Sequence, residues 1–284
     1  MSGPSSASCT DCGGVADPDG MVTTQSWPAP TEEADDTLPY PRRVAIEAVI
    51  FDWGGTLSIW AEVDIQDMWR LAGRHLSPEH EEELVASLVE VEARSWDRTH
   101  TDMRSTRLSE LLDEASRKLG VDVAGVVLEE AAAHHLDSWT PHIRHRPEAA
   151  HVLSELRSSG IKLGLLSNTH WPRGFHEHFL ERDGLAGMLD ARLYTSEMEF
   201  IKPHPAAFRA ALASLGGPDP TSVAFVGDRL YDDVFGARSA GMRTVWIRND
   251  FCPPFDVEPD AVIDSLSELP AIIGAWRTSP APAR

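Results

Sequence analysis

The sequence predicts an α/β fold in which a Rossmann-like parallel sheet core carries one inserted α-helical domain. Two features support this class. Short apolar runs that end in polar residues alternate with stretches of helical periodicity, and one long segment after the first run shows helical periodicity alone. Strands that alternate with helices are typical of a parallel sheet covered on both faces. Ligands of such sheets bind at the carboxyl ends of the strands, so the residues that follow each apolar run are the first candidates for a site.

Four apolar runs are the expected strands of the core. They span residues 44–51, 162–166, 222–226 and 243–247. Apolar residues recur at helical spacing over three further segments, which span residues 149–158, 206–215 and 231–240. The core is therefore expected to comprise residues 44–57 and 141–276.

Residues 58–140 contain no convincing strand and predict the inserted helical domain. Two sets of apolar residues each fall on one helical face. The first set is Leu84, Val85, Leu88 and Val91, and the second is Leu108, Leu111, Leu112, Ala115 and Leu119. Gly120 is placed to end the second helix, because glycine readily adopts the left-handed conformation that closes many helices.

The two ends of the chain differ from the rest in composition. Residues 1–43 are rich in Ser, Gly, Pro, Asp and Thr, and we expect an acidic, disordered tail because they offer little apolar surface to bury. Residues 277–284 are expected to form a flexible C-terminus. Cys9 and Cys12 form a single CxxC pair, which favours incidental thiols over a zinc site because no second ligand pair accompanies it.

The formal net charge of the 284-residue chain is −20, from 45 acidic and 25 basic residues. A surface of this sign repels nucleic acid and anionic lipid, so we expect no nucleic acid and no membrane as partners. The 3 cysteines make no disulfide framework, and the sequence shows no secretory signal and no run of about 18 apolar residues. We therefore expect a cytoplasmic protein, a monomer or a homodimer. An anionic substrate would need a metal or scarce basic side chains, and the only lysines are Lys118, Lys162 and Lys202.

Four short segments follow one another at the ends of the expected strands. They are Asp52-Trp53-Gly54-Gly55-Thr56, Ser167-Asn168, Lys202-Pro203, and Gly227-Asp228 with Asp232-Asp233. In this order they resemble the four motifs of the haloacid dehalogenase-like (HAD) hydrolase superfamily, and the resemblance covers residues 44 to about 275. It implies that residues 58–140 are an α-helical cap domain on a Rossmann-like core.

These residue types suit the transfer of a phosphoryl group, which needs a nucleophile and positive charge near its oxygens. The resemblance implies that Asp52 is the nucleophile and that Ser167 and Lys202 hold the transferring group. It therefore implies hydrolysis of a small phosphorylated metabolite through an aspartyl-phosphate. Further contacts with the substrate are expected from Gly55, Thr56 and Asn168.

A magnesium ion is the cofactor that the resemblance implies. Its ligands would be Asp52, the backbone carbonyl of Gly54 and Asp228, with Asp233 supporting the metal shell. Asp232 is the alternative to Asp233. Carboxylate and carbonyl oxygens are the ligands that hard cations such as Mg²⁺ prefer.

Gly54 departs from the family pattern, which is Asp-x-Asp-x-Thr. In family phosphatases the second Asp protonates the leaving group and then activates water, and such help is worth about 10²–10⁴ in rate. Glycine supplies no proton, and three explanations are open. In the first, another group replaces the acid, and the candidates are His170, Glu62, Asp64 and His75. In the second, the leaving group needs little help, as with acyl, enol or aryl phosphates. In the third, the protein is a weakly active binding scaffold.

Two relatives of the family that lack this acid provide the alternative reactions. Phosphonoacetaldehyde hydrolase has a similar first motif and uses a cap lysine as a Schiff base, but Lys118 is better explained as a charge at the end of a helix. The 2-haloacid dehalogenases need no metal and lack the Gly-Asp pair of the fourth motif. Gly227-Asp228 is present here, which favours magnesium and phosphate.

Two further groups of residues each have two interpretations. Arg94 and Arg98 lie one helical turn apart and are candidates to bind a second anionic group of the substrate, although a solvated face paired with nearby glutamates is the preferred interpretation. Trp53 and Trp60 flank the first motif, and they either line an apolar pocket or pack in the core.

Overall fold

The computed structural model describes residues 45–278 and shows one sheet of six parallel strands. The order across the sheet is β3-β2-β1-β4-β5-β6. The strands are β1 (Ala48–Phe51), β2 (Lys162–Ser167), β3 (Ala191–Tyr194), β4 (Val223–Gly227), β5 (Arg243–Ile247) and β6 (Ala261–Ile263). Strand β1 lies between β2 and β4, which are distant from it in sequence. The predicted fold class is confirmed.

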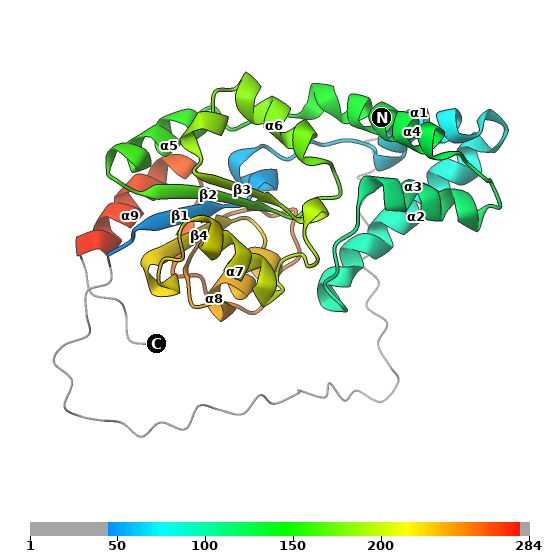
Figure 1. Cartoon of the computed structure of the whole chain (residues 1–284). Coiled ribbons are helices and arrows are strands. Elements are labelled where there is room, and N and C mark those ends of the chain that lie inside the picture. Colours follow the sequence, from blue (N-terminus) through cyan, green and yellow to red (C-terminus); the bar gives the residue numbers. More distant parts are fainter. Residues whose placement is uncertain (1–44, 279–284) are drawn as a thin grey trace, which may run out of the picture. The chain divides into compact units, whose positions relative to one another are not determined.

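Helices cover both faces of the sheet, because the side chains of each strand alternate between the two faces. Val49 and Phe51 pack in one core with α5 (Ala149–Ser158), α6 (Arg173–Arg182) and α9 (Leu269–Thr278). Ala48 and Ile50 pack in a second core with α7 (Pro205–Ser214) and α8 (Gly236–Ser239). Figure 1 shows α5 and α6 on one side of the strands and α7 and α8 on the other. Burial on both faces of the sheet explains why the sequence of β1 is a continuous apolar run.

The structure differs from the sequence-based expectation mainly at the edges of the sheet. Strands β3 and β6 were not expected; they have only four and three residues, and some residues of each lie outside the buried core, so they lack a strong apolar signal. The first strand begins at Ala48 rather than at residue 44. In place of one helix over 231–240, a wide turn at Leu230–Phe235 leads into the short helix α8.

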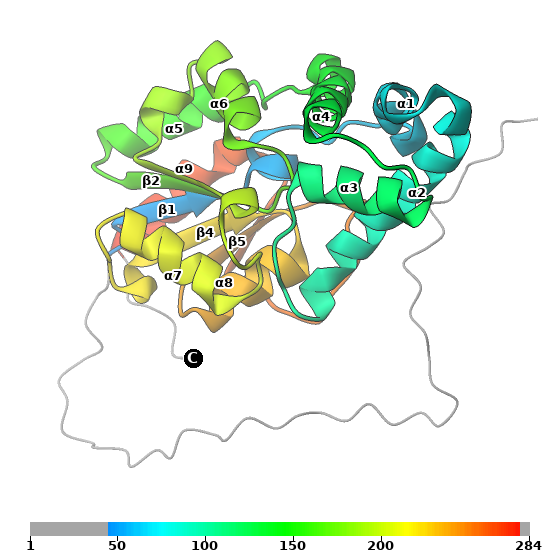
Figure 2. The same ribbon diagram turned by 45° about the vertical axis from the view of Figure 1, so that its right-hand side comes forward.

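Residues 58–140, which we call the helical insert, follow β1 and precede β2. They contain α1 (Ile65–Leu76), α2 (Glu81–Asp97), α3 (Leu108–Lys118) and α4 (Gly125–Trp139). These helices share a core of their own, which includes the apolar faces predicted for α2 and α3. Leu119 is the exception: it is 39% exposed because α3 ends at Lys118, and Gly120 closes the helix with a φ of +70°. Figure 2 shows α1–α4 grouped together.

The expected tail of residues 1–43, with Cys9 and Cys12, lies outside the described residues, as do residues 279–284. Among residues 45–278, no helix combines the length and the apolar character needed to cross a membrane.

Candidate active site

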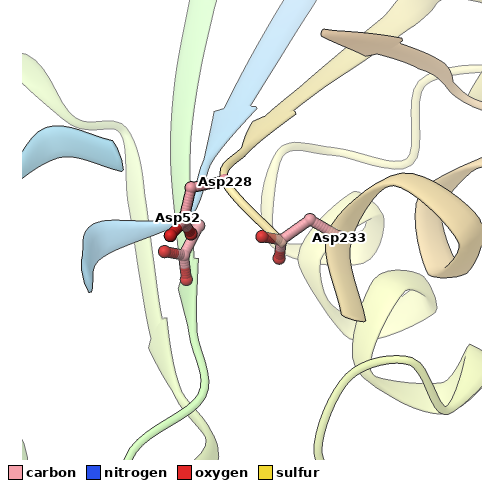
Figure 3. A group of neighbouring side chains, drawn as sticks. All are labelled: Asp52, Asp228 and Asp233. Atoms are coloured by element: carbon pink, nitrogen blue, oxygen red, sulfur yellow. The ribbon is translucent and has the colours of Figure 1, made fainter. Parts of the chain in front are cut away.

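Three aspartates from separate positions in the sequence meet at the carboxyl ends of neighbouring strands. Asp52 follows β1, Asp228 follows β4, and Asp233 lies in the turn after β4. All three are buried, and one carboxylate oxygen of each lies within 4.8 Å of the others. Figure 3 shows the three carboxylates converging. The parallel pairing of β1 with β4 brings Asp52 and Asp228 together.

Lys202 joins two of these carboxylates. Its Nζ donates hydrogen bonds to Asp52 Oδ1 at 2.7 Å and to Asp233 Oδ1 at 2.6 Å, and the side chain is almost fully buried. Burial lowers the pKa of Lys202, but the charges of Asp233 and Asp52 raise it by more, so it lies above its usual range and the lysine is charged. With all three carboxylates ionised, this single ammonium would leave the cluster with a net negative charge.

The Asp228 carboxylate has one oxygen that is fully engaged and one that is free. Oδ2 accepts hydrogen bonds from Trp60 Nε1 at 2.8 Å and from Asn249 Nδ2 at 2.6 Å. Oδ1 is buried and has no hydrogen-bond partner among the described residues. A buried acceptor without a partner is costly. Burial and the nearby charge of Asp233 also raise the pKa of Asp228.

A divalent cation fits this cluster on chemical grounds. Every candidate ligand atom is an oxygen, Asp228 Oδ1 lacks a partner, and the negative charge is larger than Lys202 alone offsets. Burial, opposed by the charge of Lys202 and assisted by the charges of Asp233 and Asp228, raises the pKa of Asp52 to about 7. A cation bound among these oxygens would favour their ionised forms.

Glycine is required at two positions around the cluster but not at Gly54. Gly55 has a φ of +78°, and a Cβ there would lie 2.3 Å from Asp228 Oδ2. A Cβ at Gly227 would lie 2.3 Å from Asp233 Cγ. Gly54, by contrast, has ordinary backbone angles, with φ −72° and ψ 120°, and a Cβ there would meet nothing within 4 Å. The absence of an acid at this position is therefore not imposed by the backbone.

The other residues predicted to contact the substrate differ in burial, in hydrogen bonding and in whether they line the cavity beside Asp52. Ser167, at the end of β2, is buried and lines the same cavity as Asp52. Asn168 is engaged by the Lys202 backbone: its Nδ2 donates to the carbonyl at 2.9 Å, and its Oδ1 accepts from the amide at 2.8 Å. Asn168, which also lines the cavity, thus positions Lys202, and its Nδ2 keeps a second N–H beyond the one donated to Lys202. Thr56 is fully buried and does not line the cavity.

Arg146 holds the first motif in place and was not found by sequence analysis. Its guanidinium donates to the backbone carbonyls of Gly55 and Thr56, each at 2.9 Å. No local pattern marks this arginine, because its role depends on the approach of a segment that lies about ninety residues later.

A cavity of about 290 Å³ opens beside Asp52, Ser167 and Lys202. Asp232 also lines it and forms an ion pair with Arg229 at 3.6 Å, whereas Asp233 belongs to the carboxylate cluster. The remaining wall is largely aromatic and includes residues that sequence analysis missed: Glu92, Trp96, Trp139 and Trp171.

Arg94 and Arg98 do not line this cavity. Arg94 forms an ion pair with Glu114 at 2.8 Å, and Arg98 forms one with Asp102 at 3.0 Å. The structure therefore brings neither guanidinium to the substrate side of Asp52, and the pairing with acidic neighbours corresponds to the solvated face that the sequence favours.

None of the predicted replacements for the missing acid is placed to donate a proton to a leaving group. Only His170 lines the cavity; its Nδ1 faces the Thr106 carbonyl at 3.1 Å, and burial lowers its pKa to about 4. It is therefore neutral near pH 7, with its proton on Nδ1. The others, Glu62, Asp64 and His75, do not line the cavity. Nor does Lys118, which pairs with Glu90, so no lysine of the insert is available for a Schiff base.

Comparison with known proteins now decides the family. The model of one family, "haloacid dehalogenase-like hydrolase", matches residues 46–241, which include all four motifs. The chain belongs to the HAD-like hydrolases. The resemblance that the motifs suggest is thereby confirmed.

Among curated HAD relatives, a glyceraldehyde 3-phosphate phosphatase of Pyrococcus furiosus is 30% identical over 153 residues, which are 53% of this chain and 59% of that protein. A phosphoserine phosphatase of Thermus thermophilus is 36% identical over 124 residues, which are 43% of this chain and 49% of that protein. This HAD chain thus spans about half of the length of these two relatives. Among solved structures, a 2-haloacid dehalogenase of Pseudomonas syringae is 28% identical with a TM-score of 0.61, and the match covers 81% of this chain and 99% of that one.

Proposed function

We propose that this chain is a magnesium-dependent phosphatase of a small phosphorylated metabolite and that it acts through an aspartyl-phosphate on Asp52. The observation that carries the proposal is the buried cluster of Asp52, Asp228 and Asp233 around Lys202. The phosphatase names of the two curated relatives support phosphate esters as the substrate class.

Each residue of the cluster has a separate role in this proposal. Mg²⁺ held by Asp52 and Asp228, with support from Asp233 and the Gly54 carbonyl, would supply positive charge to the phosphoryl oxygens. Lys202 adds a fixed ammonium beside Asp52, and the Ser167 hydroxyl donates a hydrogen bond to the transferring group. Asn168 holds the Lys202 backbone.

The reaction proceeds in two displacements on Asp52. A carboxylate oxygen of Asp52 attacks phosphorus, the bond from phosphorus to the leaving oxygen breaks, and that oxygen leaves with the electron pair. Water then hydrolyses the aspartyl-phosphate, which releases phosphate and restores the carboxylate. The acidic side chain that assists both steps in family phosphatases is missing at Gly54.

We propose that none of the four candidates named from the sequence replaces that acid and that the natural leaving group needs little protonation. His170 is neutral, and the other candidates lie outside the cavity. The helical insert serves as a cap in this proposal, because Trp60, Trp96 and Trp139 extend from it into the cavity wall. Closure of such a cap would exclude water and set specificity.

The experiment that tests the proposal measures phosphate release from a panel of acyl, aryl and sugar phosphates. Wild type is assayed with Mg²⁺ and with a chelator, beside Asp52→Asn and a matched control, Asp64→Asn, in an exposed helix-capping residue of the insert. We expect metal-dependent release that falls to background in Asp52→Asn and is retained in Asp64→Asn. Release that persists in Asp52→Asn would refute the nucleophile, and halide release from 2-haloacids without any phosphate release would refute the phosphatase.

A further inference from the structure

The cavity beside Asp52 is unusually rich in tryptophan. Of the 9 tryptophans in the chain, five line this one space. They come from the first motif, from the helical insert and from the loop after β2, and they are Trp53, Trp60, Trp96, Trp139 and Trp171. Segments far apart in the sequence thus contribute the same residue type to one wall.

Contacts among the rings hold this wall in place before a ligand arrives. Trp171 lies edge-on to Trp53 with centroids 6.3 Å apart and packs against Trp139 at 5.1 Å. Trp96 packs against the His170 ring at 4.0 Å. Rings fixed in this way present flat apolar surfaces, which are suited to a planar ligand group and bind it with little loss of side-chain freedom.

Outside the catalytic cluster, the charged side chains of the wall are Glu92 and the ion pair of Arg229 with Asp232, whose charges offset each other. Glu92 is the one ionisable side chain that the described helical insert contributes to the cavity, and Trp69 Nε1 holds it through a 2.7 Å hydrogen bond. His170, with its proton directed at a carbonyl, keeps an acceptor Nε2 without a partner among residues 45–278. A second negative charge on the substrate is disfavoured here, and a hydrogen-bond donor is favoured.

The tryptophan wall and the missing acid at Gly54 favour the same kind of leaving group. Gly54 supplies no acid, so the leaving oxygen must carry its negative charge without protonation. An oxygen attached to an aromatic ring does so because the ring delocalises the charge. That ring is also the group that a tryptophan wall would bind.

We infer that the substrate is a phosphate monoester of an aromatic alcohol that carries no second negative charge and presents a hydrogen-bond donor toward Glu92. This inference rests on the proposed function, since Asp52 must act on the phosphoryl group. Asp52 Oδ attacks phosphorus, the bond between phosphorus and the aryl oxygen breaks, and the aryloxide leaves with the electron pair and takes a proton from solvent. Water then cleaves the aspartyl-phosphate.

The test separates recognition of the ring from the acidity of the leaving group. We would compare kcat/KM for 2,4-dinitrophenyl phosphate and acetyl phosphate, whose leaving groups are similarly acidic. The aryl ester should be preferred by about tenfold or more, the scale of one good aromatic contact. Trp139→Leu should reduce this ratio, and Trp276→Leu, in α9 and outside the cavity, is the matched control.

The role of Glu92 is tested with a second pair of esters, 4-hydroxyphenyl and 4-carboxyphenyl phosphate. Wild type should prefer the hydroxyl compound, and Glu92→Gln should reduce that preference. If aryl and acyl esters react equally well, or if Trp139→Leu changes both by the same factor, the inference is wrong while the proposed phosphatase stands. If neither ester reacts with Mg²⁺ present, the proposed function fails and the inference fails with it.

Discussion

Trp60 Nε1 donates a 2.8 Å hydrogen bond to Asp228 Oδ2 and thereby links the helical insert to the carboxylate cluster. Trp60 and Asn249 both donate hydrogen bonds to Oδ2, which leaves Oδ1 as the Asp228 oxygen available to a cation. Partners of metal ligands orient those ligands. The position of the insert and the affinity of the proposed metal site are therefore coupled through one indole.

Trp60→Phe removes this hydrogen bond but keeps an aromatic ring. We expect the affinity for Mg²⁺ to fall by about 10–100-fold, the usual effect of losing a hydrogen bond to a metal ligand. The Mg²⁺ concentration dependence of the thermal unfolding midpoint measures it. Trp276→Phe, in which the replaced indole is partly buried and packs on Arg243 away from the site, should leave the Mg²⁺ dependence as in wild type. Equal Mg²⁺ dependence in both variants would contradict the coupling.

Gly54→Asp should restore the missing acid. The backbone there is ordinary and a Cβ meets nothing within 4 Å, so a side chain is accommodated. We expect kcat/KM, which reports the first displacement, to rise by about 10²–10⁴ for alkyl phosphates and by much less for esters with acidic leaving groups. Gly54→Asn is the control of matched size without an acid. If Asn and Asp give the same gain, or if neither does, general acid catalysis is not what the site lacks.

Alanine should destabilise the fold at Gly55 and have little effect at the adjacent Gly54. Gly55→Ala places a side chain at a φ of +78°, and this backbone conformation alone should lower the free energy of unfolding by about 1–2 kcal/mol. The new Cβ would also lie 2.2 Å from Trp60 Nε1. Gly54→Ala should change the free energy of unfolding by less than about 1 kcal/mol. Urea unfolding of both variants measures the difference, and equal losses would show that the turn is not as described.

Acid should weaken the fold through buried histidines, of which His135 in the insert is the clearest. Its ring stacks on Trp69, and burial lowers its pKa from 6.5 to about 3. Between these values the unfolded chain binds a proton that the folded chain does not, so stability rises with pH and is lost as pH falls below 6.5.

At about pH 5 this amounts to about 2 kcal/mol for His135. His135→Phe should reduce the slope of unfolding free energy against pH, whatever its effect on absolute stability. His170 and His176, whose pKa values burial lowers to about 4 and about 3, keep part of the slope in the variant. A slope identical to wild type would mean that His135 is not buried in its neutral form.

The centre of the fold and of the site could be predicted from the sequence because the signals there are local. Strand β1 is an apolar run that ends directly at Asp52, and β4 ends at Gly227-Asp228. Parallel neighbours must bring such ends together. Strands β3 and β6 escaped prediction because β3 is interrupted by Arg192 and β6 has only three residues, so neither forms a long apolar run.

Roles that depend on tertiary contacts could not be predicted. Asn168 looks like a polar residue at a strand end, and only the fold shows that the Lys202 backbone engages its amide. Glu92 is one of several acidic residues of α2, and its place in the cavity wall follows from how the insert packs against the core. The structure also places Arg94 and Arg98 outside the cavity, which helical periodicity alone did not decide.

The most direct test of the central claim is to trap phosphoryl-Asp52. With no side chain at Gly54 to activate water, the second step should be slow and the aspartyl-phosphate should accumulate. Wild type is mixed with Mg²⁺ and an aryl phosphate, quenched in acid, digested and analysed by mass spectrometry, beside Asp52→Asn. We expect one phosphoryl group on the peptide that contains Asp52, formed at the rate of the first turnover and absent in the variant. Turnover without any phosphoryl group on that peptide, or with the group on another residue, would contradict the account.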